Sequence, residues 1–404
     1  MLSGFDYFFS QKNLNLFKPP SIKGEIMHSK AIYPILVILM VISLAFVSIV
    51  DAGSWDSPIN LTVSTVTDRD SCISADGSKI AFARDDGEDW EVFVINSDGT
   101  GLTQLTDNSV DDIAPSISAD GGKVAFRHGL FGKRQICIIN SDESGYNELT
   151  DDSEDDVGLS LSGDGTKIAF TRVLGDAPQL FVINSDGSGL KQLTDNTDFN
   201  LDPSISDDGC KIAFRKSIVG GEIFVINSDG SELKQLTSKE NDMQPSISGD
   251  GSKVTFQRGF SLDENAYEIF VINSDGSGLT QLTSNNEGDR YPSINGDGTE
   301  VAFQQGFDNA TEIFVVNSDG SGLTQLTSNN AENKYPSISD SGERIVFESN
   351  GDIYLVNYTS GESVKKGDNS VFPAEIIVGS VVAVAITASV FVMFYLKRKE
   401  GRKN

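Results

Sequence analysis

Short runs of apolar residues alternate with polar turn residues along most of the chain, four runs to a unit, and the unit repeats. Its first half reads Ser-x-Ser-x-Asp-Gly-x-Lys-Ile/Val-Ala-Phe, and its second half reads Ile/Val-Phe-Val-Ile-Asn-Ser-Asp-Gly-Ser-Gly-Leu-x-Gln-Leu-Thr. The phenylalanine that ends the first half occurs seven times, at Phe82, Phe126, Phe170, Phe214, Phe256, Phe303 and Phe347. Four short strands in a unit of about 40–45 residues are typical of a β-propeller blade. We therefore predict an all-β fold, a seven-bladed β-propeller with four-stranded blades.

The third unit illustrates the expected strands. The inner strand is expected at residues 159–162, and residues 167–171 form the second strand after an Asp-Gly turn, in which glycine supplies the positive φ of a tight hairpin. The third strand, residues 179–184, is apolar on both faces, as expected for a strand between two neighbouring blades. The outer strand follows at residues 190–194. Since one blade alone cannot bury both faces, contacts between blades should supply most of the stability.

The sequence also indicates how the ring closes. Residues 61–67 alternate apolar and polar positions ahead of the first unit, whereas the last unit ends weakly at residues 361–364. We expect residues 61–67 to pair with the third strand of the last blade, about Ile353–Tyr358, which would remove an exposed sheet edge. The propeller is accordingly assigned to residues 53–364.

Two apolar segments lie outside the repeats. Residues 31–50 are nearly all apolar and follow basic residues, which predicts a signal peptide region within residues 1–52. Met27 is an alternative start of the protein. An uncleaved membrane anchor is the alternative function of this segment. Residues 376–396 carry no charge and are long enough to span a bilayer as one helix. Residues 365–375 are then a stalk.

Basic residues follow the second apolar segment at once, at Lys397, Arg398 and Lys399. Because basic residues stay on the cytoplasmic side, residues 397–404 are predicted to be a cytoplasmic tail. The protein is then a single-pass membrane protein with its propeller outside, in the periplasm or the extracellular space. The same C-terminal region also resembles a processed sorting signal, which is the alternative.

The repeat pattern resembles the WD40-like PD40 repeats of TolB-type propellers, from residue 59 to about residue 364. This resemblance implies a propeller fold. Related propellers serve as periplasmic or surface protein-binding platforms, as accessory domains of serine peptidases, or as lyases acting on pectic sugars. The chain departs from TolB in having seven repeats rather than six and no separate α/β domain before them, so TolB's own partner is not carried over.

Composition excludes several classes of function. The net charge of −28 repels nucleic-acid phosphates, so no nucleic-acid partner is expected. The three cysteines, Cys72, Cys137 and Cys210, occupy unrelated repeat positions and form neither a disulfide framework nor a zinc site. Cys137 replaces a phenylalanine of the other repeats and is interpreted as a core residue.

Candidate catalytic chemistry is sparse. A serine peptidase would need a Gly-x-Ser-x-Gly motif with a partner histidine, and the only histidines are His28 and His128. A propeller lyase would be expected to use a histidine-rich metal site. The Asn-Ser-Asp-Gly segments are interpreted as Asx turns rather than calcium loops. We therefore expect a non-enzymatic protein with no cofactor, metal site or catalytic residue. Three sequons, at Asn60, Asn309 and Asn357, are compatible with an outside location.

Charged residues recur at fixed repeat positions. Two residues after the repeat phenylalanine stand Arg84, His128, Arg172, Lys216 and Arg258, followed by Gln305 and Ser349. Acidic residues near the start of the inner strands include Asp111, Asp112, Asp155, Asp156, Asp202, Asp242 and Asp289. One interpretation is a set of partly exposed ion pairs between blades, each contributing roughly 0–1 kcal/mol. The other is a charged ring at the channel mouth that selects a ligand.

The two faces of the disc are expected to differ. The Asp-Gly and Asn-Ser-Asp-Gly turns are nearly constant and belong to one face, because strands alternate in direction. The loops of the other face vary and carry aromatic residues, which suits recognition. We hypothesise that a partner docks on the variable loops through Trp90, Tyr291 and Tyr335, above Arg84, Arg172, Lys216 and Arg258. The partner would be a protein or a surface polysaccharide bound by a non-enzymatic binding or scaffolding protein. The alternatives are a carbohydrate-active propeller, lyase-like or hydrolase-like, and a structural or adhesive envelope protein.

Overall fold

The computed structural model describes residues 53–360, except residues 86, 152, 218–220, 239–240, 260–266, 286 and 308–309. Residues 53–360 form one compact unit. The signal peptide region, the stalk, the membrane-spanning segment and the basic tail predicted above lie outside the described residues. Within the described part of the chain, every regular element is a β-strand, and no helix could cross a membrane.

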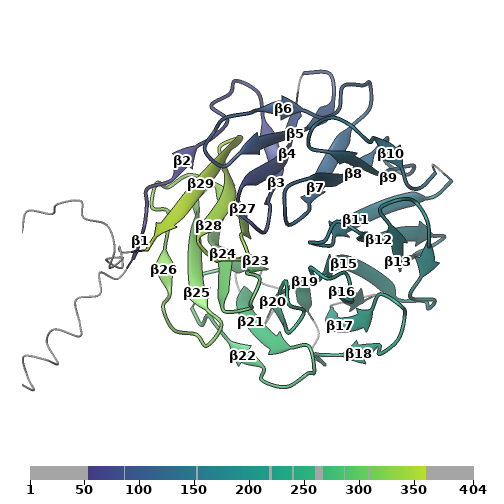
Figure 1. The fold of residues 1–404 in the computed structure, drawn as a ribbon. Coiled ribbons are helices and arrows are strands. Elements are labelled where there is room, and N and C mark those ends of the chain that lie inside the picture. The colour runs from purple at the N-terminus through teal and green to yellow at the C-terminus, as the bar shows by residue number, and fades with distance from the viewer. Residues whose placement is uncertain are drawn as a thin grey trace, which may run out of the picture. The chain divides into compact units, whose positions relative to one another are not determined.

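The strands form seven antiparallel sheets, arranged as blades around a central axis (Figure 1). The first three blades contain β3 (Asp68–Ile73), β4 (Lys79–Asp85), β5 (Trp90–Asn96) and β6 (Thr103–Gln104); β7 (Asp112–Ile117), β8 (Lys123–His128), β9 (Gln135–Asn140) and β10 (Asn147–Glu148); and β11 (Asp155–Leu161), β12 (Lys167–Leu174), β13 (Ala177–Asn184) and β14 (Lys191–Gln192). The inner strand of each blade lies nearest the axis.

The remaining blades follow the same order. Blades 4 to 6 contain β15 (Phe199–Ile205), β16 (Lys211–Ser217), β17 (Glu222–Asn227) and β18 (Lys234–Gln235); β19 (Asp242–Ile247), β20 (Lys253–Gly259), β21 (Tyr267–Asn273) and β22 (Thr280–Gln281); and β23 (Asp289–Ile294), β24 (Glu300–Phe307), β25 (Ala310–Asn317) and β26 (Thr324–Gln325). Blade 7 contains β27 (Asn333–Ile338), β28 (Arg344–Ser349) and β29 (Asp352–Thr359) together with β1 (Ser54–Trp55) and β2 (Ile59–Asn60). The predicted seven-bladed, all-β propeller is therefore confirmed.

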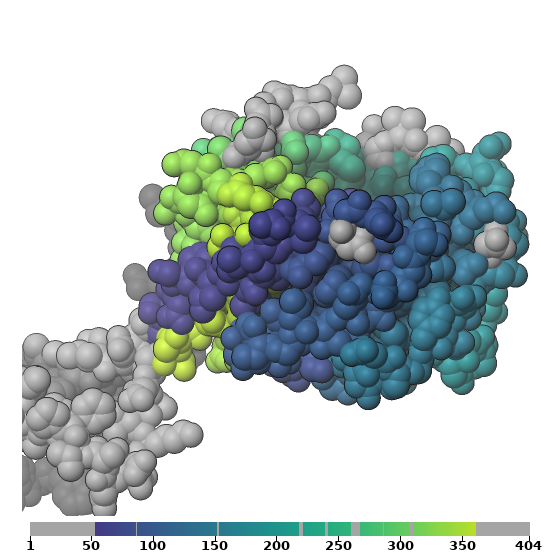
Figure 2. Space-filling view, turned by 90° about the horizontal axis from the view of Figure 1, so that it is seen from above, coloured from purple at the N-terminus to yellow at the C-terminus, as the bar shows by residue number. Residues whose placement is uncertain are grey.

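The N-terminal residues close the ring, mostly ahead of the positions that the sequence suggested. β1 pairs with the end of β29 and β2 pairs with its middle, so the closing strands span residues 54–60. Of the expected segment 61–67, the first residue continues this pairing, because Leu61 N donates to Ile353 O at 2.9 Å. Figure 2 shows these residues, in purple, lying against the yellow last blade. The backbone N–H groups of Thr62 and Val63 both donate to Asn60 Oδ1, and Val63 has a φ of +21°. This turn ends the pairing and leads the chain to blade 1.

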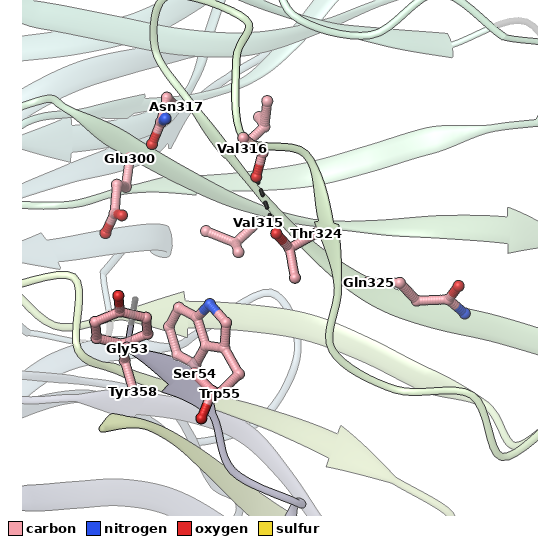
Figure 3. Close-up of a pocket in the computed structure, with 11 residues that line it drawn as sticks. Gly53, Ser54, Trp55, Glu300, Val315, Val316, Asn317, Thr324, Gln325 and Tyr358 are labelled. Carbon is pink, nitrogen blue, oxygen red and sulfur yellow. Dashed lines mark hydrogen bonds between the residues drawn. The ribbon is translucent and has the colours of Figure 1, made fainter. Parts of the chain in front are cut away.

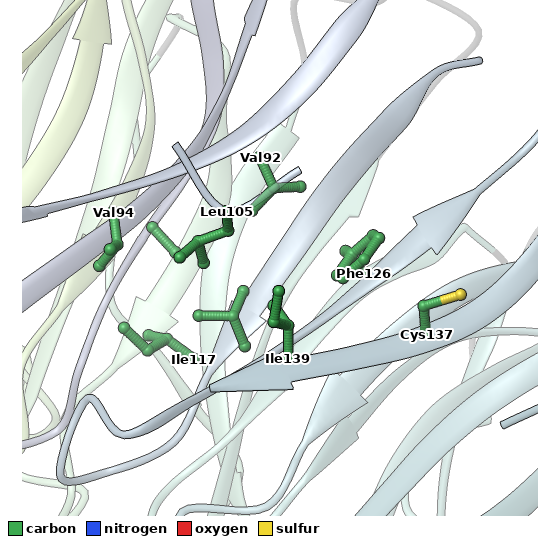
Figure 4. Close-up of a cluster of buried hydrophobic side chains, with 9 residues drawn as sticks. Val92, Val94, Leu105, Ile117, Phe126, Cys137 and Ile139 are labelled. Carbon is green, nitrogen blue, oxygen red and sulfur yellow. The ribbon is translucent and has the colours of Figure 1, made fainter. Parts of the chain in front are cut away.

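The hydrophobic core lies between the blades. All seven repeat phenylalanines are at most 1% exposed. One cluster joins Ala81, Val92 and Val94 of blade 1 to Phe126 and Cys137 of blade 2 (Figure 4). Cys137 is fully buried, and burial raises the pKa of its thiol to about 12, so the interpretation of Cys137 as a core residue is confirmed.

Each inner strand contains a β-bulge with one residue in the left-handed conformation. These seven residues have φ between +47° and +56° and are Asp70, Ala114, Gly158, Asp202, Gln244, Tyr291 and Tyr335. Some of their N–H groups bond to side chains of the preceding blade: Tyr291 N donates to Gln257 Oε1 at 2.9 Å, and Tyr335 N donates to Gln304 Oε1 at 3.1 Å. A bulge redirects a side chain out of the sheet, so these positions set what faces the end of the channel.

Candidate functional site

The two constant turns of each blade lie on the same face, as predicted. In blade 1, Ser97 N of the second turn donates to Ser78 O of the first turn at 2.9 Å. Asp98 Oδ1 accepts the N–H and hydroxyl of Thr100, so the Asn-Ser-Asp-Gly segment is an Asx turn, as interpreted from the sequence. We call this side the constant-turn face. The opposite side, formed by the loops between strands two and three and between successive blades, is the variable-loop face.

Lysine side chains that recur at one position of the repeat hydrogen-bond to the next blade on the constant-turn face. Lys253 Nζ donates to Gly298 O and to Ser318 Oγ of blade 6, both at 2.8 Å. Equivalent bonds to the turn glycine of the next blade come from Lys123, Lys167, Lys211 and Arg344. Blade 6 has Glu300 at this position, so the joint between blades 6 and 7 lacks the lysine bond.

The basic residues of the proposed binding site pair within their own blades. Arg84 and Asp68 lie opposite each other on β4 and β3, and two hydrogen bonds of 2.6 and 2.9 Å join them. Arg172 pairs with Asp156, and Arg258 pairs with Asp242, in the same way. For these three arginines the expectation of partly exposed ion pairs between blades is wrong, because each pair joins the first two strands of one blade and its carboxylate is 0% exposed. Asp155 of the predicted acidic set does pair between blades, with Arg134 of blade 2.

Lys216 differs from the three arginines. The residue opposite it on β15 is Asn200, and its ammonium group instead lies 2.9 Å from Asp198. The four basic residues therefore belong to four separate blades and are each engaged by a carboxylate. They support the inner strands of the blades and do not form one shared site.

These pairs belong to larger polar networks at the blade joints. Between blades 1 and 2, Asn108 N donates to Glu91 Oε1 and Asn108 Nδ2 donates to Asp112 Oδ2, both at 2.6 Å. His128 Nδ1 lies 2.7 Å from Asp112 Oδ1, which raises the pKa of the histidine. Burial raises the pKa of Glu91 to about 7.

The network between blades 5 and 6 has no basic member among its described residues. Asp289 lies opposite Gln305 on β24, and Gln305 Nε2 donates to it at 2.8 Å. Burial raises the pKa of Asp289 to about 7, with a further contribution from the neighbouring Glu268. In blade 7 the positions equivalent to Asp289 and Gln305 are occupied by Asn333 and Ser349, so this blade has neither the acidic residue nor a basic partner at these positions.

Two of the predicted aromatic site residues lie together on the variable-loop side. The rings of Tyr291 and Tyr335 form an edge-on pair with centroids 4.6 Å apart, and Lys334 Nζ lies 5.6 Å from the Tyr335 ring centroid. Tyr335 is 40% exposed. Burial and the neighbouring Tyr291 raise the pKa of Tyr335 to about 12, and Glu348 and Asp70 contribute further.

Trp90, the third predicted aromatic residue, lies in blade 1 and is half-buried. The Arg69 guanidinium covers its ring at 3.5 Å from the centroid, a close cation–π contact. Arg69 also forms an ion pair of 3.6 Å with Asp70, whose N–H donates to Glu348 Oε1 of blade 7. The site residues thus follow an arc over blades 6, 7 and 1.

An exposed apolar tip projects from blade 2 and was not among the predicted site residues. Leu130 is 65% exposed and Phe131 is 88% exposed. The Arg134 guanidinium lies 4.7 Å from the Phe131 ring centroid, and Arg134 is fixed by two hydrogen bonds to Asp155 of blade 3. The sequence signal was present, since Leu-Phe stands between two glycines in a variable loop.

A hollow at the joint between blades 6 and 7 lies away from these residues. A cavity of about 450 Å³ between blades 6 and 7 is lined by Trp55, Tyr358, Glu300 and Gln325 among others (Figure 3). Trp55 and Tyr358 form an edge-on pair with centroids 5.4 Å apart. In the part of the chain that the structure describes, no group of three or more His, Cys, Asp and Glu side chains is placed to hold a metal ion.

Comparison with known proteins agrees with this architecture. Residues 71–265 match the PD40 family, described as the TolB beta propeller domain. No curated protein matches the chain. Among solved structures, the chain is similar to TolB from Acinetobacter baumannii, with 18% identity, coverage of 65% of this chain and 67% of that chain, and a TM-score of 0.50.

Two enzymes have similar structures. An oligogalacturonate lyase in complex with manganese is 18% identical over 78% of this chain and 98% of its own, with a TM-score of 0.61. A puromycin-hydrolyzing peptidase from Mycobacterium tuberculosis is 17% identical over 77% of this chain and 55% of its own, with a TM-score of 0.55. At these identities the likeness concerns the fold alone. The repeats, the family match over residues 71–265 and the seven blades together show a seven-bladed β-propeller that contains a PD40, TolB-type β-propeller domain.

Proposed function

We propose that this protein is a non-enzymatic binding platform whose variable-loop face recognises a protein partner. The observation that carries the proposal is the difference between the two faces. On the constant-turn face, the turn aspartates accept hydrogen bonds within their own turns, and most of the repeat lysines donate to the next blade and hold the blades together. The variable-loop face instead presents aromatic side chains supported by basic residues.

The proposed contact surface has two parts. The first is the arc of Tyr291, Tyr335 and the Arg69-covered Trp90 over blades 6, 7 and 1. The second is the tip formed by Leu130 and Phe131 on blade 2. Rigid aromatic side chains that lose little conformational entropy on binding are typical anchors of protein interfaces. Of the four predicted basic residues, Arg84 of blade 1 lies in a blade that carries this surface, whereas Arg172, Lys216 and Arg258 belong to blades 3, 4 and 5.

The topology of the last blade fits a membrane-anchored arrangement. β29 ends on the constant-turn face, where Tyr358 N donates to Glu343 O of the first turn at 2.7 Å. A tether that follows β29 therefore leaves the propeller on the face opposite the variable loops. We include in the proposal that residues 376–396 anchor the chain in a membrane with the propeller outside the cytoplasm. Added protease should then degrade the propeller on intact cells and spare an epitope at Asn404.

The binding proposal is tested with the purified full-length chain as bait in envelope extract. Phe131→Ala and the double replacement Tyr291→Ala, Tyr335→Ala should each reduce recovery of the partner by roughly 30-fold if the residue is a hot spot worth about 2 kcal/mol. The matched controls are Asp275→Asn and Asp319→Asn in exposed constant turns, which should leave recovery unchanged. Loss of binding in the controls alone would place the site on the opposite face.

A carbohydrate ligand is the second candidate, because an exposed tyrosine pair is a surface on which a sugar ring can stack. It is favoured if envelope polysaccharide competes with the recovered protein and if the tyrosine variants lose polysaccharide binding. Shortening of an oligogalacturonate or another polysaccharide by the purified chain would instead support an enzyme and contradict the proposal. Lateral self-association of the purified chain would favour the structural or adhesive alternative.

A further inference from the structure

One residue of each blade stands directly before the turn between its first and second strands, next to the propeller axis on the constant-turn face. The seven residues are Ala75, Ala119, Gly163, Asp207, Gly249, Gly296 and Asp340. Backbone hydrogen bonds connect them from blade to blade: Asp207 N donates to Gly249 O and Asp340 N donates to Ala75 O, both at 2.9 Å. Five of the seven residues are glycine or alanine, and the two exceptions are both aspartates.

Aliphatic side chains form the next layer along the axis. Each blade contributes one, and the seven are Ile73, Ile117, Leu161, Ile205, Ile247, Ile294 and Ile338. Together with the small residues and the two aspartates they enclose a cavity of about 190 Å³. The aspartates therefore lie at one end of this axial cavity, partly removed from water.

The two aspartates approach each other across the axis. Asp207 belongs to blade 4 and Asp340 to blade 7, which are not neighbours in the ring, yet both carboxyl groups line the same axial cavity and the same hollow at its constant-turn end. Glycine is required beside them: a Cβ at position 163 or 249 would overlap with Asp207, and one at position 296 would lie 2.5 Å from Asp340 Cγ. The sequence thus provides room for this one pair of side chains.

A hydrogen bond between two carboxyl groups needs a proton, because a carboxylate only accepts. The ionisable groups that face the pair are themselves acidic: Asp164 and Asp208 act on Asp207, and Asp297 acts on Asp340. The lysines of the adjoining turns donate to the carbonyl oxygens of Gly209, Gly251 and Gly298. Burial, together with Asp340, raises the pKa of Asp207 to about 7, and burial raises the pKa of Asp340.

We propose that Asp207 and Asp340 form a proton-dependent cross-link between blades 4 and 7, closed in mildly acidic solution and released above neutral pH. With one shared proton, the pair joins opposite sides of the ring and closes the constant-turn end of the axial cavity. After loss of that proton, two carboxylates face each other beside three further aspartates and repel. The propeller then loses a connection across its axis and opens at that end.

The direction of the pH effect follows from the raised pKa. A carboxyl group whose pKa is higher in the folded state than in the unfolded chain stabilises the fold fully below its ordinary value, and this stabilisation is lost as pH rises through the folded value. The contribution of the pair is therefore present at pH 5 and absent at pH 8.

Thermal unfolding of the full-length chain at pH 5 and pH 8 tests the proposal. Asp207→Asn keeps a hydrogen-bond donor beside Asp340 and removes the repulsion. Its melting temperature should match the wild type at pH 5 and exceed it at pH 8 by about 2 °C or more. Asp340→Asn should change the melting temperature in the same way. Combining Asp207→Asn with Asp340→Asn should raise the melting temperature at pH 8 no further than either replacement alone. A gain in stability at high pH is not what loss of a merely structural contact would give.

The control is Asp289→Asn, which removes a different buried acid at the joint between blades 5 and 6. It should change the pH profile independently and leave the effect of Asp207→Asn unaltered. In the infrared spectrum, the band of a protonated carboxyl group should disappear between pH 5 and 8 in the wild type and be weaker in Asp207→Asn. Equal destabilisation of Asp207→Asn at both pH values, or an infrared band unchanged by the substitution, would overturn the proposal.

Discussion

Lys253 of blade 5 donates a hydrogen bond of 2.8 Å to the carbonyl oxygen of Gly298 in blade 6, and the same bond recurs at most blade joints. At the next joint the lysine position is occupied by Glu300, which cannot donate this bond as a carboxylate. Burial raises the pKa of Glu300, and its side chain lies beside Gly342, the equivalent of Gly298. The joint between blades 6 and 7 is therefore less strongly connected, and a cavity of about 450 Å³ lies at this joint.

The first prediction concerns this joint. Glu300→Lys should restore the missing bond to Gly342 and remove a buried acid, which should stabilise the fold by about 1 kcal/mol. We expect a rise in melting temperature of roughly 2 °C by calorimetry. The matched control is Lys253→Glu, which should lower the melting temperature. No gain in Glu300→Lys would show that the lysine bonds contribute little.

The second prediction concerns the pairs of oppositely charged residues inside the blades. Arg258→Ser would leave Asp242 buried and unpaired, at a cost of about 3–5 kcal/mol in the free energy of unfolding. Combining it with Asp242→Asn reproduces the natural Asn333 and Ser349 of blade 7 and should recover most of the loss. Urea unfolding of both variants measures the difference. If the double variant is no more stable than the single one, the buried charge is not the cause.

The third prediction concerns ring closure. Asn60 Nδ2 donates to Asp352 Oδ2 at 2.8 Å and to Tyr354 Oη at 3.2 Å, while Asn60 Oδ1 accepts two backbone N–H groups. Deleting residues 53–60 should expose the edge of β29, lower the melting temperature by several degrees and make β29 a site of proteolysis. An unchanged melting temperature would contradict the closure by β1 and β2.

The fourth prediction concerns modification of the same residue. Asn60 belongs to a sequon, but a glycan would have to be attached to the nitrogen that donates to Asp352 and Tyr354. We therefore expect Asn60 to be unmodified in the folded protein, whatever the state of Asn357. Mass spectrometry of the protein purified from its native source measures both positions. A glycan on Asn60 would show that the ring closes differently.

The fifth prediction concerns pH. The pKa values of Glu91, Asp289 and Glu348 are raised to about 7 by burial. Their stabilising contributions are present below about pH 4, the ordinary range of carboxyl groups, and are lost as pH rises toward 7. His128, with a raised pKa, contributes in the same direction. The free energy of unfolding should fall by about 2–4 kcal/mol between pH 5 and pH 8.

The aspartates of the constant turns change the free energy of unfolding in the opposite direction, at lower pH. Their hydroxyl and N–H donors hold the pKa values of residues such as Asp120 and Asp164 below the usual value, so their contribution is lost as pH falls through that range. Stability should therefore be greatest near about pH 4, between the two ranges in which contributions are lost. Urea unfolding from pH 3 to pH 9 gives the profile, and Asp289→Asn should flatten its alkaline side. A maximum above pH 7 would contradict the raised pKa values.

The sequence alone determined the number of blades, the turn types and the buried phenylalanines. These features depend on local rules, since alternation of apolar residues specifies strands, Asp-Gly supplies the turn, and seven copies leave little ambiguity. Phe126 and Cys137 were assigned correctly to the core because their repeat positions are apolar in every unit. Two faces of different character also followed from the alternating direction of the strands.

Tertiary structure alone decided which residues are available for binding. A ring of binding residues would recur in the repeat, and so do Arg84, Arg172 and Arg258. In the structure each of them lies opposite a buried aspartate on the neighbouring strand. Composition does not show this, because it does not specify the register between strands. The sequence placed the closing strand at residues 61–67, but the turn at Asn60 moves it to residues 54–60. Asp207 and Asp340 meet only because the closed ring brings blades 4 and 7 to opposite sides of one narrow axis, and a local pattern does not encode that distance.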